Sequence, residues 1–299
     1  MELPDLVPKF EFLEVTDNDG KRFHFFRGRA TTLVPREEAT RSLVNSLDSL
    51  ATTKQVSPYL FFNDLYFEIE SIRALRQNLD RLFEQASAQC SHAIRFGQCY
   101  GEVEMAICVL FESKWQSIIL IEQCLKFKFT PTLAEALCRS VSSRWLTIYH
   151  VTFDKAEMER LALCLCENPN IEALVLGHVF NGDKSMVAFV KHLPRMSHLR
   201  CMWLEGNKFG EVGERALVEV LEQQGSHTIF KLNLAGKPTS LQNYVDFLLW
   251  LKKNGSRPAI SSSSRMKWIQ LLAHFKKEDE DPSALYYTLR SDPGRFEHL

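Results

Sequence analysis

Apolar residues recur with the spacing L-x-x-L-x-L through the middle of the chain. The clearest set is Leu199, Met202 and Leu204, and similar sets precede and follow it. The middle residues of the sets fall at positions 65, 94, 118, 148, 174, 202 and 232, so successive sets are 24 to 30 residues apart. Alternating inward and outward residues over so short a span predict a strand with one buried face in each set.

The residues between one strand and the next predict a helix. After Leu204, apolar residues recur at helical spacing at Ala216, Leu217, Val220 and Leu221, and the turn "QQG" follows them. A single unit of one strand and one helix cannot bury its apolar face. We therefore expect the units to stack side by side.

The segment LRCMWLEGNKF (199–209) also places Asn207 and Phe209 at the last two positions of the pattern L-x-x-L-x-L-x-x-N-x-L. In these residues the chain resembles the leucine-rich-repeat proteins, and its period with a full helix per unit is similar to the ribonuclease-inhibitor-like subclass. The resemblance covers residues 62–255. It implies an α/β fold, a right-handed leucine-rich-repeat solenoid (horseshoe) with a parallel concave sheet and helices on the convex face.

The two ends of the chain lack the repeat. "FEFLEVTDNDGKRFHFF" alternates on both sides of a turn sequence, which predicts a β-hairpin, and a helix is expected to begin near Pro35. The segment "RMKWIQLLAHFKK" predicts a short amphipathic helix near the other end. We therefore divide the chain into an N-terminal hairpin and helix capping region (1–61), the leucine-rich repeats (62–255) and a C-terminal helical cap or tail (256–299).

One residue of each predicted strand lies between two core positions and should point away from the helices. These residues are Tyr66, Arg95, Ile119, Tyr149, Val175, Trp203 and Asn233, with Glu205 and Lys231 at one margin. Since parallel strands lie ~4.8 Å apart, the apolar members would form a continuous row. Two interpretations remain open: the row binds a partner, or the ends of the chain itself cover it.

Composition narrows the choice of partner and compartment. The 299 residues carry a formal net charge of −1, which gives no electrostatic reason to expect nucleic acid or an anionic membrane as a partner. The longest apolar stretches fall far short of a ~20-residue membrane span, and the first residues do not resemble a signal peptide. The eight cysteines include no C-x-x-C pair and lie in apolar segments, which is typical of reduced, buried residues. We expect a cytoplasmic protein, and a nuclear location stays open.

The sequence contains no recognisable catalytic constellation. H-E-x-x-H, G-x-S-x-G and a complete phosphate-binding loop are all absent, so we expect no catalytic residue, no metal site and no cofactor. His150 occupies a predicted core position and is expected to be a buried imidazole. Asn207 and Asn181 are expected to bond the backbone of the turns.

These observations favour a non-catalytic protein–protein interaction scaffold that binds a protein partner of unknown identity on its apolar concave face. One alternative is a regulator of a small GTPase, similar to the Ran GTPase-activating class, which carries such repeats. Another is a substrate-recruiting adaptor for protein degradation. The sequence does not determine the oligomeric state.

Overall fold

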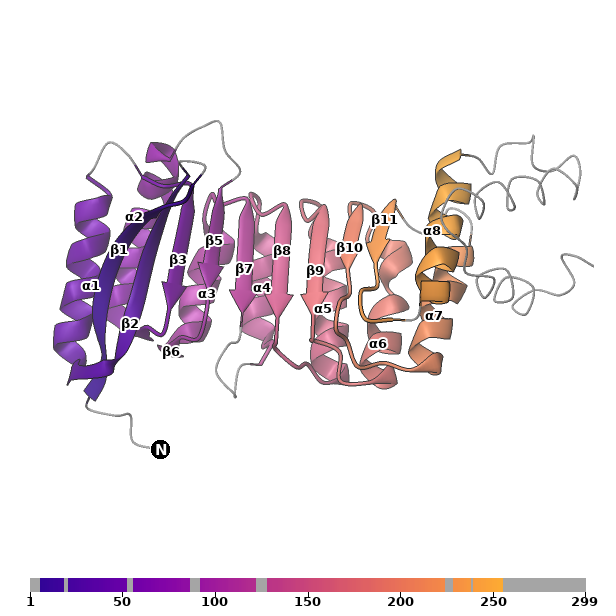
Figure 1. Cartoon of the computed structure of the whole chain (residues 1–299), viewed down its shortest axis with the longest axis horizontal. Coiled ribbons are helices and arrows are strands. Elements are labelled where there is room, and N and C mark those ends of the chain that lie inside the picture. Colours follow the sequence, from indigo (N-terminus) through magenta and orange to yellow (C-terminus); the bar gives the residue numbers. More distant parts are fainter. Residues whose placement is uncertain are drawn as a thin grey trace, which may run out of the picture.

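The computed structural model describes residues 6–18, 21–52, 56–86, 92–121, 128–223, 228–237 and 239–254. Within these residues, nine strands form one sheet in the order β1-β2-β3-β5-β7-β8-β9-β10-β11, and β4 and β6 form a second, two-stranded sheet. Every neighbouring pair in the large sheet is parallel except β1 with β2. The sheet does not close on itself, and its strands follow one another in sequence order (Figure 1).

In the described part of the chain, each strand of the large sheet from β3 onward is followed by at least one helix before the next strand of that sheet. The strands are β1 (Leu6–Thr16), β2 (Arg22–Pro35), β3 (Tyr59–Asn63), β4 (Tyr66–Phe67), β5 (Ala93–Phe96), β6 (Tyr100–Gly101), β7 (Ser117–Ile121), β8 (Trp145–Tyr149), β9 (Ala173–Gly177), β10 (Cys201–Trp203) and β11 (Lys231–Asn233). The helices are α1 (Arg36–Leu50), α2 (Ile69–Gln85), α3 (Val103–Glu112), α4 (Pro131–Arg139), α5 (Lys155–Glu167), α6 (Asp183–Val190), the 3-10 turn η1 (Leu193–Arg195), α7 (Glu211–Glu222) and α8 (Thr239–Asn254).

Helices α1 to α7 lie behind one face of the large sheet, and each packs against the next helix in sequence (Figure 1). The inward strand residues and the apolar helix faces together form one continuous core. The structure therefore confirms three predictions. They are the succession of strands and helices, the largely parallel sheet and the helix that begins after Pro35.

The predicted hairpin is also confirmed, and it continues the large sheet. Strands β1 and β2 pair antiparallel, and β2 then pairs parallel with β3. The ring of Phe26 stacks on that of Phe62 with centroids 4.7 Å apart, so the hairpin shares the core of the repeated units. The predicted C-terminal part, 256–299, lies outside the described residues.

Strand pairing corrects the predicted register in two units. The inward residues that pair across the sheet are Leu60, Ile94, Ile118, Leu146, Leu174, Met202 and Leu232. Leu65 and Ile148 were the wrong choices in the first and fourth units. With Leu146 in place, the steps from Ile94 onward become 24, 28, 28, 28 and 30 residues, which is a more regular period than the one read from the sequence.

The register error has a physical origin at the first position of the L-x-x-L-x-L pattern. In the two misread units this position holds a buried serine, Ser57 or Ser143, whereas it holds Trp115, Ile171, Leu199 or Ile229 in the later units that were read correctly. The hydroxyl of Ser140 donates to that of Ser143, whose hydroxyl lies 3.4 Å from the carbonyl of Trp115. A hydrogen-bonded serine therefore fills a site where the pattern search requires an apolar side chain.

The side chain of Asn207 holds the turn of the neighbouring unit. Its Oδ1 accepts from the backbone N–H groups of Val179 and Phe180 at 2.7 and 2.9 Å, and its Nδ2 donates to the carbonyl of Leu176 at 2.6 Å. Asn207 is buried, so these bonds satisfy backbone groups that water does not reach. The structural role predicted for Asn207 is confirmed, whereas Asn181 is exposed to solvent.

Two other units use a different donor at the position of Asn207. The buried thiol of Cys99 lies 3.9 Å from the carbonyl of Phe62, in the unit before. The ammonium of Lys237 donates to the carbonyl of Phe209, lies 3.7 Å from the centre of its ring and pairs with Glu214 at 3.4 Å. A donor reaches from one unit to the backbone of its neighbour in each case.

Candidate functional site

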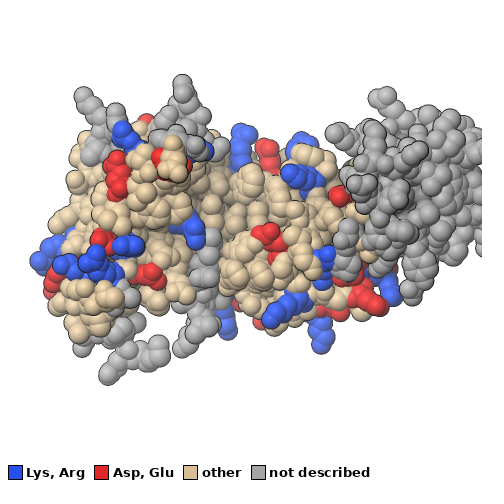
Figure 2. All heavy atoms as spheres, in the orientation of Figure 1, with Lys and Arg blue, Asp and Glu red and all other residues tan. Residues whose placement is uncertain are grey.

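The face of the sheet opposite helices α1 to α7 is named here the open face. Its central row consists of residues that pair across successive strands: Phe25, Phe61, Arg95, Ile119, Thr147, Val175, Trp203 and Asn233. All of them are at least partly exposed. Most charged side chains in this view gather along the margins of the face rather than in its middle (Figure 2).

Five of the predicted site residues lie together in this central row. They are Arg95, Ile119, Val175, Trp203 and Asn233. Lys231 lies on the same face one row away, paired with Cys201, and half-buried Glu205 follows the end of β10.

Tyr149 and Tyr66 do not occupy the predicted positions. Thr147 takes the place of Tyr149 in the central row, and Tyr149 lies two residues further along β8, where it pairs with Gly177. Tyr66 belongs to β4 in the small sheet and is buried against Val7, Val34 and Ala39. The prediction for Tyr66 was therefore wrong, and Phe61 occupies the corresponding position on the open face.

A pair of stacked tryptophans forms the most pronounced feature of the open face. The rings of Trp145 on β8 and Trp203 on β10 lie 5.3 Å apart at an interplanar angle of 16°. Strand β9 runs between them and contributes the small residue Ala173, which is only 8% exposed. On the other side of Trp203, the Lys231 ammonium lies 5.4 Å from the ring centre. We call Trp145, Trp203 and Lys231 the tryptophan cluster.

A second group of aromatic residues lies at the other end of the face. The repeat pattern of the sequence did not predict it. Phe23, Phe25, Tyr59 and Phe61 stack in pairs, with Phe25 and Phe61 4.6 Å apart at 14° and Phe23 and Tyr59 5.2 Å apart. The guanidinium of Arg95 lies 5.8 Å from the centre of the Phe61 ring. We call these four aromatic residues and Arg95 the phenylalanine cluster.

The two clusters share one feature and are joined by partly exposed residues between them. In each of them, a cation from the next strand lies over an aromatic ring, an arrangement worth roughly 0.5–1 kcal/mol at an exposed position. Partly exposed Ile119, Thr147 and Val175 connect the clusters along the central row. Large aromatic residues around an apolar centre, with charges toward the margin, are typical of protein-binding surfaces.

His150 lies at the end of β8 and not in the core. It is exposed, its backbone is in the left-handed region at φ 56°, and its ring stacks on that of His178 at 4.4 Å and 10°. His178 has the same backbone conformation, and a Cβ atom at Gly206 in the next unit would lie 2.2 Å from its ring. The prediction of a buried imidazole was wrong because it followed from the misread register.

The described cysteines are free and mostly lie on the helix side of the sheet. The thiols of Cys138 on α4 and Cys164 on α5 are 3.0 Å apart, and burial raises the pKa of both. Burial also raises the pKa of Cys108 to about 11. Cys201 is half-buried on the open face, and burial raises its pKa although the nearby Lys231 opposes the shift. None of these environments favours the reactive thiolate.

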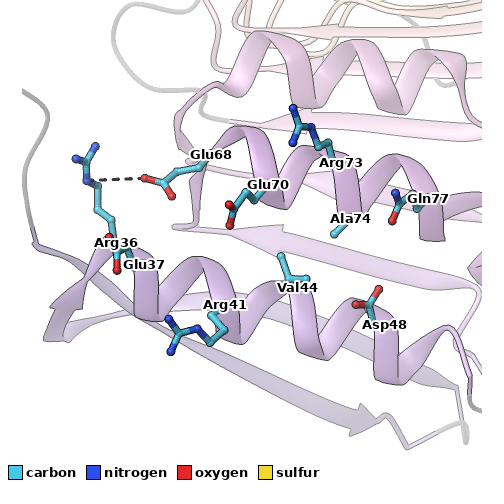
Figure 3. Close-up of a pocket in the computed structure, with 10 residues that line it drawn as sticks. All are labelled: Arg36, Glu37, Arg41, Val44, Asp48, Glu68, Glu70, Arg73, Ala74 and Gln77. Atoms are coloured by element: carbon cyan, nitrogen blue, oxygen red, sulfur yellow. Dashed lines mark ion pairs between the residues drawn. The ribbon is translucent and has the colours of Figure 1, made fainter.

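A groove lies between helices α1 and α2, away from the open face (Figure 3). Both signs of charge line it, from Arg36, Arg41 and Arg73 and from Glu37, Asp48, Glu68 and Glu70. Arg36 pairs with Glu68 at 3.8 Å, and Glu68 also accepts from the hydroxyl of Thr40 at 3.0 Å. Such a mixed lining gives no field of one sign that would attract a charged ligand.

The described residues contain neither a group of metal ligands nor a helix that could span a membrane. Among the described residues, no three His, Cys, Asp or Glu side chains are placed to hold a metal ion. None of the helices in the described part of the chain has the length and apolar composition needed to cross a membrane. No family model matches the sequence, and no curated protein matches it.

Proposed function

We propose that this chain is a non-catalytic scaffold that binds a protein partner on the open face. The observation that carries the proposal is the tryptophan cluster, because two large aromatic side chains stack at the surface instead of in the core. Trp145 is 42% exposed in this arrangement. An exposed aromatic pair next to an apolar row is the composition from which binding hot spots are usually built.

We further propose that the fold is a leucine-rich-repeat solenoid (horseshoe) of the ribonuclease-inhibitor-like subclass. Three features support it: parallel strands in sequence order, helices behind one face, and steps close to 28 residues. A fourth feature is a hydrogen-bond donor at one position of the repeat, Asn207 or Cys99, that faces a backbone carbonyl of the preceding unit. Asparagine or cysteine at this position is typical of these repeats. In such a solenoid the open face is the concave face, where partners have the largest contact area.

Affinity capture from native lysate tests the binding proposal. The bait is the full chain, compared with the double variant Trp145→Ala, Trp203→Ala. The matched control is Leu163→Ala, Val212→Ala, which removes two exposed apolar side chains from α5 and α7 on the helix side.

We expect proteins captured by the wild type to be retained by the control and lost by the tryptophan variant. Circular dichroism and melting temperature verify that each bait is folded. Equal capture by the wild type and a folded tryptophan variant would exclude the open face as the binding site.

A further inference from the structure

We propose that the partner presents an amphipathic α-helix that lies across the open face, with acidic side chains near both of its ends. This inference rests on the proposed function and specifies the chemistry of the partner. Its basis is the position of two cations, Arg95 on β5 and Lys231 on β11, because these strands flank the four strands that carry Ile119, Thr147, Val175 and Trp203.

Both cations are available to an acidic partner. Arg95 and Lys231 are exposed, and neither forms an ion pair with any residue in the described part of the chain. By contrast, Arg27 and Arg29 in the hairpin both pair with Glu11, at 3.0 and 3.1 Å. Arg95 and Lys231 each lie instead over an aromatic ring of their own cluster, which holds them on the open face.

The spacing of the two cations sets the length of the helix. Lys231 on β11 is five strands away from Arg95 on β5, through β7, β8, β9 and β10. Five steps of ~4.8 Å give a separation of about 24 Å along the sheet. An α-helix rises ~1.5 Å per residue, so about 16 residues separate two acidic side chains that reach both cations.

The backbone chemistry of the face favours a helix over an extended segment. The N–H and C=O groups of the central strands are already paired in the sheet, so they cannot bond a segment that crosses them. An extended segment against Ile119 and Val175 would bury its own backbone groups without partners, which is costly. A helix satisfies its backbone internally and presents only side chains.

The width of the face also fits one helix. Along β8, Trp145, Thr147 and Tyr149 all lie on the open face, and four residues of strand span about 13 Å. A helix with its side chains is ~10–12 Å across. One helix therefore fills the face from the tryptophan cluster to Tyr149.

A displayed library of helix-forming 21-residue peptides tests the inference directly. Each peptide carries Leu, Ile, Val, Phe or Trp along one face and Glu, Lys, Gln or Ala elsewhere. Selection uses the full chain, the charge-reversed variant Arg95→Glu, Lys231→Glu, and the control Arg81→Glu, Lys184→Glu on helices α2 and α6.

We expect binders of the wild type and of the control to be enriched at least tenfold in Glu pairs 14 to 18 positions apart. The charge-reversed variant should select Lys at these positions and bind the Glu peptides at least tenfold more weakly. Replacing both Glu by Lys in a peptide should restore its binding to that variant.

Two results would overturn the inference while leaving the proposed function intact, provided that native capture depends on Trp145 and Trp203. One is a set of binders without an acidic preference, or binders that tolerate the charge reversal. The other is the absence of any selected helix, which is the result if a segment of the chain itself or a non-helical partner occupies the face. Loss of tryptophan dependence in native capture would instead refute the proposed function.

Discussion

Replacing Asn207 by alanine should strongly destabilise the fold. The amide side chain accepts two backbone N–H groups, from Val179 and Phe180, and donates to the carbonyl of Leu176. The variant leaves three buried polar groups without these partners. Since an unsatisfied buried group costs ~1–3 kcal/mol, the free energy of unfolding should fall by about 3 kcal/mol or more.

Urea denaturation followed by far-UV circular dichroism measures this loss. With an m-value of about 3 kcal/mol per molar urea, a loss of about 3 kcal/mol moves the midpoint down by about 1 M. The conservative variant Asn207→Asp keeps the two accepted bonds but places a carboxylate oxygen against the carbonyl of Leu176. It should therefore also be destabilised.

The matched control is Asn181→Ala, because Asn181 is exposed at the same turn. Its free energy of unfolding should remain within about 0.5 kcal/mol of the wild type, as for most surface substitutions. A loss below about 1 kcal/mol for Asn207→Ala would show that the three hydrogen bonds contribute no more than an ordinary surface contact. Asn207 would then not be needed to stabilise the turn.

Three further predictions follow from burial and exposure. Burial lowers the pKa of His24 below its ordinary value of about 6.5, so the unfolded chain binds a proton there that the folded chain does not. The free energy of unfolding should therefore fall as the pH drops from 7.5 to 5. In denaturation curves, His24→Gln should reduce the dependence of this free energy on pH. An unchanged dependence would show that His24 is not responsible for it. The described cysteines should react slowly with iodoacetamide at pH 7.5. The rate for Cys108 should still be rising near pH 10, because burial raises the pKa of that thiol to about 11. Mass spectrometry that finds four or more thiols rapidly labelled in the folded protein would disprove this. Trp203→Ala should cost about 2 kcal/mol of stability, because it removes the stack on Trp145 and the contact of the ring with the Lys231 ammonium, each worth about 1 kcal/mol. A loss of ~3–5 kcal/mol, typical of a buried aromatic residue, would mean that the tryptophan pair belongs to the core.

The sequence predicted the open face correctly wherever the first position of the repeat is apolar. In the units that begin with Ile171, Leu199 and Ile229, the predicted outward residues lie in the central row. This position is buried, so its side chain is either apolar, as in these units, or hydrogen-bonded, as Ser143 is. The spacing therefore identifies the register without any knowledge of the structure.

The two failures differ because only the first kept the prediction within its strand, where side chains alternate with a period of two. The shift from Leu146 to Ile148 moved the prediction by two residues, so it still selected the open face and named Tyr149 in place of Thr147. The shift from Leu60 to Leu65 moved the prediction past the end of β3 and selected buried Tyr66, which belongs to β4 in the small sheet. Both misread units have serine at the first position, but so does the unit of Ile94, with Ser91, whose outward residue Arg95 was predicted correctly. Serine therefore removes the signal that identifies the register, and the remaining apolar positions decide the outcome.

The phenylalanine cluster and the stacking of the two tryptophans depend on contacts between distant segments. Phe25 reaches the open face only because β2 pairs with β3, which the alternation within the hairpin does not reveal. Trp145 and Trp203 come together only because β8 and β10 flank a strand that carries Ala173. Strand order and the size of the intervening residue decide this contact, and a corrected register would have indicated it.

Site-specific photo-crosslinking in living cells tests whether the open face binds a protein partner. A benzoylphenylalanine residue at position 175, in the middle of the open face, is compared with one at position 163 on the outer side of α5. We expect a crosslink to a second protein at position 175 that disappears in the Trp145→Ala, Trp203→Ala background, and no such product at position 163. Crosslinks from position 175 only to the chain's own residues, or equal products from both positions, would contradict this prediction.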